Sequence, residues 1–129
     1  MIKTLWALLL TVVLSGCDVN IEAVSSQFDQ QFGTQNFVSA VSVIELHRLR
    51  NGDYPSSLNE LEFLGDWDSI WLSSVEYERV EGGYNLFVTK GFSGGEPDVS
   101  MPIRFKQGLG LKLTNVQWLD DSSRPTTML

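Results

Sequence analysis

The sequence predicts an α+β domain in which an N-terminal helix packs on a roughly four-stranded antiparallel sheet. Apolar residues recur at helical spacing through residues 35–50. Residues 75–90 alternate between apolar and polar side chains around a pair of glycines, and residues 103–113 alternate again around another glycine. One strong helical pattern followed by two hairpin patterns therefore gives the α+β class.

The first sixteen residues have the layout of a secretory signal peptide. Lys3 supplies a positive charge, residues 5–14 are apolar apart from Thr11, and the small residues Ser15 and Gly16 follow. An apolar run of about ten residues is too short to span a bilayer, which takes about twenty. We therefore expect residues 1–16 to be a cleaved leader.

The end of this leader, Leu14-Ser15-Gly16-Cys17, closely resembles the lipobox of bacterial lipoproteins. The resemblance implies that Cys17 is joined to diacylglycerol, becomes the N-terminus after cleavage and is then N-acylated. Its partner is then the lipid bilayer, which two or more acyl chains hold stably. In an ordinary secreted protein this single cysteine would instead be an unpaired thiol.

Asp18, directly after the cysteine, is similar to the signal that keeps lipoproteins of enteric-type bacteria in the inner membrane. We expect a lipid-anchored protein of the bacterial cell envelope that faces the periplasm, with the outer membrane as the alternative. With Cys17 committed to lipid, the mature chain has no disulfide and depends on packing alone.

The composition limits both the size and the partners of the domain. Sixteen acidic and nine basic residues give a net charge of −7, which argues against nucleic acid and against a basic surface that adheres to anionic lipid. The length suits one domain with a modest core. We assign residues 17–33 to a lipidated N-terminus and helical tether, residues 34–119 to the α+β domain and residues 120–129 to a polar tail.

Two helical segments are predicted before the sheet. Residues 20–32 carry a narrow apolar stripe, namely Ile21, Val24, Phe28 and Phe32. Gly33-Thr34 is expected to interrupt the helix, with Thr34 as the cap of a second helix over residues 35–50. Apolar positions surround nearly the whole of that second helix, so we expect all its sides to be covered. Asn51-Gly52 is expected to end it.

A short helix and two hairpins are predicted next. Pro55 suits a helix start, and Ser57 and Glu60 have the spacing of a capping box, so a short helix should end near Gly65. The first hairpin is expected over residues 75–80 and 84–90, with Gly82-Gly83 supplying the positive φ of its turn. The second is expected over residues 103–106 and 109–113, after a glycine-rich loop over residues 91–98.

Residues 51–55 (Asn-Gly-Asp-Tyr-Pro) follow the long helix and precede Leu58, Leu61 and the first hairpin. This arrangement is similar to the globular part of type IV pilins and type II secretion pseudopilins, over roughly residues 38–91. The resemblance implies a helix that packs across an antiparallel sheet. Pilins begin with a peptidase site and a long apolar helix, whereas this chain has Cys17 in that place. We therefore do not expect an ordinary filament subunit.

Two tryptophans, Trp67 and Trp71, lie in the connection over residues 66–74. They form either a binding face for a sugar or protein ligand or part of the core at one end of the sheet. Core packing is the favoured interpretation, because an indole ring buries a large area.

Catalytic and metal sites find little support in the residue types. Residues 91–95 match the G-x-S-x-G pattern around Ser93, but no helical pattern follows and His47 precedes the serine. His47 alone cannot form a zinc site. Some pseudopilins bind calcium in a comparable region, and here the ligands would have to be loop carboxylates. Calcium needs several oxygen ligands that converge from one loop, and the spacing of these carboxylates does not show such a loop. Those carboxylates are Asp66, Asp68, Glu96 and Asp98.

The sequence thus predicts a lipoprotein that is not an enzyme and needs no cofactor, with no metal-ligating residues assigned and calcium binding left open. It is expected to dock onto a protein partner in an envelope assembly, such as secretion or pilus machinery. The alternative is a stand-alone periplasmic binding or inhibitor module that recognises a sugar or peptide through Trp67 and Trp71.

Overall fold

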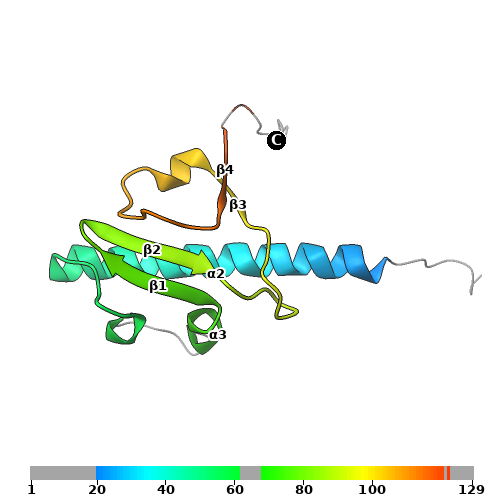
Figure 1. Ribbon diagram of the computed structural model, residues 1–129, viewed down its shortest axis with the longest axis horizontal. Helices are drawn as coiled ribbons and strands as arrows, with labels where there is room; N and C mark the ends of the chain where they lie inside the picture. The colour runs from blue at the N-terminus through cyan, green and yellow to red at the C-terminus, as the bar shows by residue number, and fades with distance from the viewer. Residues whose placement is uncertain (1–19, 62–67, 121, 123–129) are drawn as a thin grey trace, which may run out of the picture.

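The computed structural model describes residues 20–61, 68–120 and 122 of the chain. It confirms the predicted α+β class, with a long helix beside small sheets (Figure 1). The first half contains α2 (Ile21–Asn51), the 3-10 helix η1 (Leu58–Glu60) and the short helix α3 (Asp68–Leu72). The second half contains β1 (Val75–Val80), β2 (Gly83–Val88), β3 (Ser100–Pro102), the 3-10 helix η2 (Ile103–Lys106) and β4 (Gln117–Leu119).

Helix α2 has well-defined ends. The side chain of Asn20 accepts a hydrogen bond from the backbone N–H of Ala23 at the start of the helix. At the other end Gly52 adopts a φ of 80° and donates its N–H to the carbonyl oxygen of Arg48. The predicted end at Asn51-Gly52 is therefore confirmed, because glycine takes this left-handed conformation without strain.

The predicted interruption at Gly33-Thr34 is wrong, since α2 is continuous over 31 residues. Gly33 is buried inside the helix against Pro97 and Val99, and a Cβ there would lie 2.6 Å from Cγ of Pro97. The hydroxyl of Thr34 donates to the carbonyl oxygen of Gln30 one turn earlier. Gly33 thus provides close packing, and Thr34 does not cap a second helix. The proposed division between residues 17–33 and 34–119 consequently falls inside one helix.

The first hairpin is confirmed. β1 and β2 pair antiparallel from Val75 opposite Val88 to Val80 opposite Gly83. The turn consists of Glu81 and Gly82, and Gly82 has a positive φ of 73°. Gly83, which was expected to share this conformation, is instead the first residue of β2 and does not have a positive φ.

The second hairpin, and with it the four-stranded antiparallel sheet, is wrong. The described residues form two two-stranded sheets, and β3 pairs with β4 in parallel, with Ser100 opposite Gln117. Residues 103–106 form η2, which begins after Pro102, a residue without a backbone donor.

Residues 110–113 lie along the free edge of β2 instead of pairing with residues 103–106. Tyr84 donates its N–H to the carbonyl oxygen of Gly110, and Lys112 and Leu113 bond to Tyr84 and Leu86 in turn. The single bridge between Tyr84 and Leu111 is parallel. The alternation of residues 109–113 correctly indicated extended backbone, but it carried no information about which segment would accept the hydrogen bonds.

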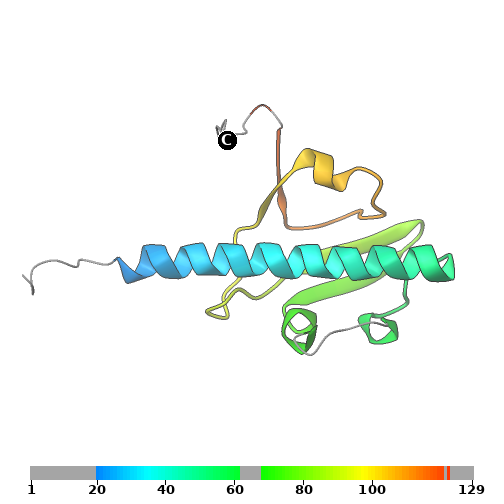
Figure 2. The ribbon, with the colours of Figure 1, turned by 180° about the vertical axis from the view of Figure 1, so that it is seen from behind.

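The core lies between α2 and the hairpin. On α2 it is formed by Phe37, Ala40, Val41 and Ile44, and on β2 by Tyr84, Leu86 and Val88. The opposite face of α2 is not covered by any described element (Figure 2). There Leu49 is 78% exposed, so the helix is not covered on all sides as expected.

Within the described residues, two short helices lie between α2 and the hairpin. Residues 68–72 form α3 where a connection was expected, and the predicted short helix is represented by η1. Its expected end near Gly65 lies outside the described residues. None of the described helices is both long and apolar enough to cross a membrane.

Candidate functional site

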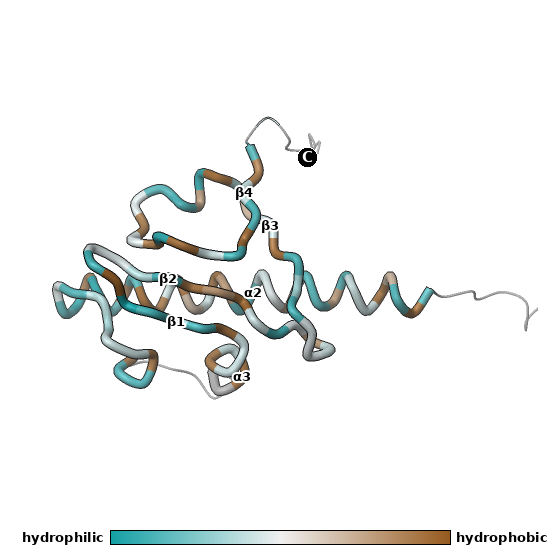
Figure 3. Tube along the Cα trace, viewed as in Figure 1, coloured by the Kyte–Doolittle hydropathy of each residue, from teal (hydrophilic) through white to brown (hydrophobic). Residues whose placement is uncertain are grey.

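An apolar cluster is exposed at the N-terminal end of α2. It consists of Ile21, Val24, Phe28 and Phe32 on the helix and Phe92 on the loop after β2, and we call it the phenylalanine cluster. Ile21 is 77% exposed, Phe28 53% and Phe92 71%. Figure 3 shows apolar residues recurring along α2 as far as this end, which extends beyond the sheet. The stripe predicted from the helical spacing is therefore present and open to solvent.

The ring of Phe92 completes the stripe from the side. Its centroid lies 6.2 Å from the centroid of Phe28 and 6.0 Å from that of Phe32. Distances of this size are typical of favourable aromatic pairs. The loop thus adds a third aromatic ring to the two on the helix.

Asp29 of α2 holds the loop in place. Its carboxylate accepts a hydrogen bond from the backbone N–H of Ser93 at 2.7 Å and one from the Ser93 hydroxyl at 2.5 Å. These bonds, the hydroxyl one first, lower the pKa of Asp29. The loop is closed by a hydrogen bond from the N–H of Gly91 to the carbonyl oxygen of Gly95. The loop with Phe92 is therefore fixed to the helix.

The same contacts give the G-x-S-x-G pattern a structural role. The hydroxyl of Ser93 donates to Asp29, whereas the nucleophile of a hydrolase would bond to a histidine. His47 lies four residues before the C-terminal end of α2, at the opposite end from Asp29. Sequence reasoning missed the role of Asp29, because a contact across 64 residues leaves no local signal.

An acidic hollow of about 590 Å³ adjoins the phenylalanine cluster, between α2 and residues 96–98. Its carboxylates are Glu22, Asp29, Glu96 and Asp98. Glu96 also accepts a hydrogen bond from the side-chain amide of Asn115. Within the described part of the chain, no three histidine, cysteine or acidic side chains are grouped as metal ligands. Of the calcium candidates, Asp66 lies outside the described residues and Asp68 begins α3.

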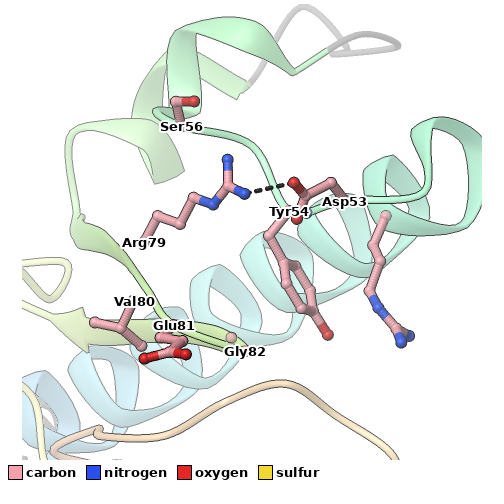
Figure 4. A pocket seen from close by; sticks show the side chains of 9 residues that line it. Asp53, Tyr54, Ser56, Arg79, Val80, Glu81 and Gly82 are labelled. Carbon is pink, nitrogen blue, oxygen red and sulfur yellow. Dashed lines mark hydrogen bonds and ion pairs between the residues drawn. The ribbon is translucent and has the colours of Figure 1, made fainter.

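A second hollow, of about 640 Å³, lies between the C-terminal end of α2 and the hairpin turn (Figure 4). The guanidinium of Arg79 points across it and pairs with the carboxylate of Asp53 at 2.5 Å. The guanidinium of Arg48 lies 5.4 Å from the ring centroid of Tyr54. Arg48 and Arg79 are thus both engaged by neighbouring side chains of the hollow.

Glu45 joins four segments behind this hollow. Its carboxylate accepts hydrogen bonds from the hydroxyls of Tyr54 and Tyr84 and from the backbone N–H of Gly110, at 3.0–3.2 Å. Glu45 was not predicted as a site residue, although one sign was available in the sequence. Glu45 is the only charged residue between Phe37 and Leu46.

All three tyrosines of the chain have raised pKa values, which predicts loss of stability in alkali. Burial raises the pKa of Tyr77 to about 12 from an ordinary value of 10.0, and burial followed by the charge of Glu45 raises those of Tyr54 and Tyr84. The contribution to stability is complete below pH 10 and is lost as the pH rises toward and past 12.

We therefore expect the urea midpoint to be constant up to about pH 9.5 and to fall at higher pH. The tyrosinate absorbance of Tyr77 and Tyr84 should appear in one cooperative step with unfolding, instead of titrating near pH 10. A smooth titration of Tyr77 or Tyr84 near pH 10 in the folded protein would contradict this prediction.

Of the site residues predicted from the sequence, the structure describes only Trp71. Leu14, Ser15, Gly16, Cys17, Asp18 and Trp67 lie outside the described residues. Trp71 belongs to the core and is 5% exposed. The structure therefore gives Trp71 the packing role, and its ring offers no open face to a sugar or peptide.

Comparisons of the chain with protein-family models, with curated proteins and with solved structures found no match. No relative therefore supplies a function for this chain. The resemblances to lipoprotein leaders and to pilin heads remain predictions from the residues.

Proposed function

We propose that the protein is a lipoprotein, anchored by Cys17 and facing the periplasm, whose pilin-like domain docks onto an envelope assembly without catalysing a reaction. One observation carries the proposal: α2 packs on the hairpin with one face, and on the other face no helix or strand of the described residues covers it and the ring of Phe92 packs beside Phe28 and Phe32 (Figure 2). Apolar residues lie on this open face at both ends, Ile21 and Phe28 at one and Leu46 and Leu49 at the other. Exposed apolar groups on a helix are typical of surfaces that bind a partner.

The lipid anchor supports this role by keeping the domain at the membrane. The leader ends in the lipobox-like Leu14-Ser15-Gly16-Cys17. Since the anchor occupies the place of a pilin's membrane helix, the domain is proposed as an accessory component and not as a filament subunit.

The anchor is tested by metabolic labelling. Cys17→Ser should abolish incorporation of labelled palmitate and leave the precursor uncleaved, because the thiol that receives the diacylglycerol is gone. Ser15→Ala is the matched control, since it keeps a small residue before the cysteine and should label normally. Equal labelling of Cys17→Ser and the parent protein would contradict the anchor.

Docking is tested by site-specific crosslinking in native membranes. A photoreactive amino acid in place of Leu46 or Leu49 should give a discrete adduct of higher mass. The same amino acid in place of Glu76, an exposed residue of β1, should give none. Recovery of the protein alone and monodisperse, without an adduct at either position on α2, would contradict the docking role.

A further inference from the structure

We propose that the phenylalanine cluster rests in the interfacial layer of a predominantly zwitterionic bilayer, so that α2 leans on the membrane that holds Cys17. The inference rests on the lipid anchor of the proposed function. It adds to that function the surface that the anchored domain turns toward the lipid.

The chain between Cys17 and α2 is short. Cys17 precedes Ile21 by four residues, and four residues span at most about 14 Å. Val24 and Phe28 follow at about 5 and 10 Å further along the helix. With Cys17 acylated, the start of α2 therefore lies close to the headgroup layer, and leaning brings the whole cluster onto it.

The apolar stripe of α2 faces away from the sheet. At about 100° per residue, Phe28 lies on the side of α2 opposite Phe37, which is fully buried against the hairpin. A helix that leans on the stripe therefore turns the sheet away from the bilayer. The part of this open face that carries the phenylalanine cluster, at the N-terminal end of α2, is the part that would approach the lipid (Figure 2).

Phe92 is held at the surface by its loop. Exposing 71% of an apolar ring to water does not stabilise the fold, yet both carboxylate oxygens of Asp29 hydrogen-bond this loop to α2. The result is two well-exposed aromatic rings, Phe28 and Phe92, presented together beside Ile21. Aromatic and aliphatic side chains on one side of a helix are the groups that enter the interfacial layer.

The negative charge of the protein near the cluster determines which lipid headgroups it can approach. The hollow beside the cluster is lined by Glu22, Asp29, Glu96 and Asp98, and the whole chain carries a net charge of −7. Anionic headgroups would repel this region. The fitting surface is therefore composed mainly of zwitterionic phospholipid, and apolar burial drives the contact.

The experiment uses the full-length protein, matured and lipidated in cells and reconstituted into phosphatidylcholine vesicles. Single-cysteine variants Phe28→Cys and Phe92→Cys are labelled with the environment-sensitive dye NBD. Leu49→Cys is the matched control, because Leu49 is 78% exposed on the same helix about 32 Å from Phe28. An acylated Cys17 has no free thiol, so each variant should take up one dye.

We expect NBD at positions 28 and 92 to fluoresce several-fold more strongly than at 49, and to be quenched by lipids with a spin label near the headgroup. Both effects should decrease in vesicles rich in phosphatidylglycerol and recover with added salt.

Three results would overturn the inference, and they are distinguishable. One dye per chain with equal, weak emission at all three positions would be consistent with the lipid anchor but would contradict the membrane contact of the cluster. Two dyes per chain, or no vesicle association, shows an unmodified Cys17 and removes the anchor as well. Emission that increases with protein density without quenching by the spin-labelled lipid shows that a second copy covers the cluster.

Discussion

Replacing Glu45 with alanine is expected to lower the free energy of unfolding by about 3 kcal/mol. The carboxylate is the acceptor for the hydroxyls of Tyr54 and Tyr84 and for the backbone N–H of Gly110. Tyr84 is fully buried, so its hydroxyl cannot turn to water when the acceptor is removed. Urea unfolding followed by circular dichroism measures the loss.

Two variants control for this change. Glu45→Gln keeps a carbonyl oxygen in place and should cost about 1 kcal/mol. Glu22→Ala removes an exposed glutamate from the first turn of the same helix and should cost less than about 0.5 kcal/mol. A stability of Glu45→Ala equal to that of Glu22→Ala would show that the carboxylate does not join the segments as described.

Gly83→Ala is expected to destabilise the protein by about 3 kcal/mol or more. A Cβ at this position would lie 2.0 Å from the carbonyl oxygen of Gly110. That oxygen also accepts the N–H of Tyr84, so residues 110–113 cannot move away without losing hydrogen bonds to β2. Chemical denaturation should show the loss, and hydrogen exchange should show faster exchange at Lys112 and Leu113.

Gly95→Ala is the control for this substitution. A Cβ at Gly95 meets no atom within 4 Å, so its stability should stay within about 0.5 kcal/mol of the parent protein. If Gly83→Ala were as stable as Gly95→Ala, the close approach of residues 110–113 to β2 would be wrong.

Local rules predicted the features that local sequence determines. Gly52 ends α2 and Gly82 forms the hairpin turn because only a few residue types adopt a positive φ. The apolar stripe from Ile21 to Phe32 follows from helical spacing in the same way. These features need no knowledge of the rest of the chain.

Features set by distant partners could not be predicted. A glycine inside a helical pattern predicts an interruption, but glycine is needed at position 33 for close packing against Pro97, which lies 64 residues further on. Residues 109–113 had the alternation of a strand, but the alternation is equally compatible with a hairpin and with the free edge of β2. Pairing with Tyr84 was decided by tertiary packing.

The candidate site shows the same division. The helical side of the phenylalanine cluster was visible in the sequence, whereas Phe92 and its tie to Asp29 were not. Glu45 was overlooked because its partners come from three separate segments of the chain. Trp71 shows the reverse case, since its residue type suggested a binding face and its burial removes that face.

The continuity of α2 through Gly33 has a mechanical consequence. A helix of 31 residues is about 46 Å long, and with no break in it the helix acts as a lever fixed at one end. A change of 10° in its tilt moves the far end, with Leu46 and Leu49, by about 8 Å. With the proposed lipid contacts at one end of the molecule, the tilt of α2 would set the height at which the other end meets the proposed partner.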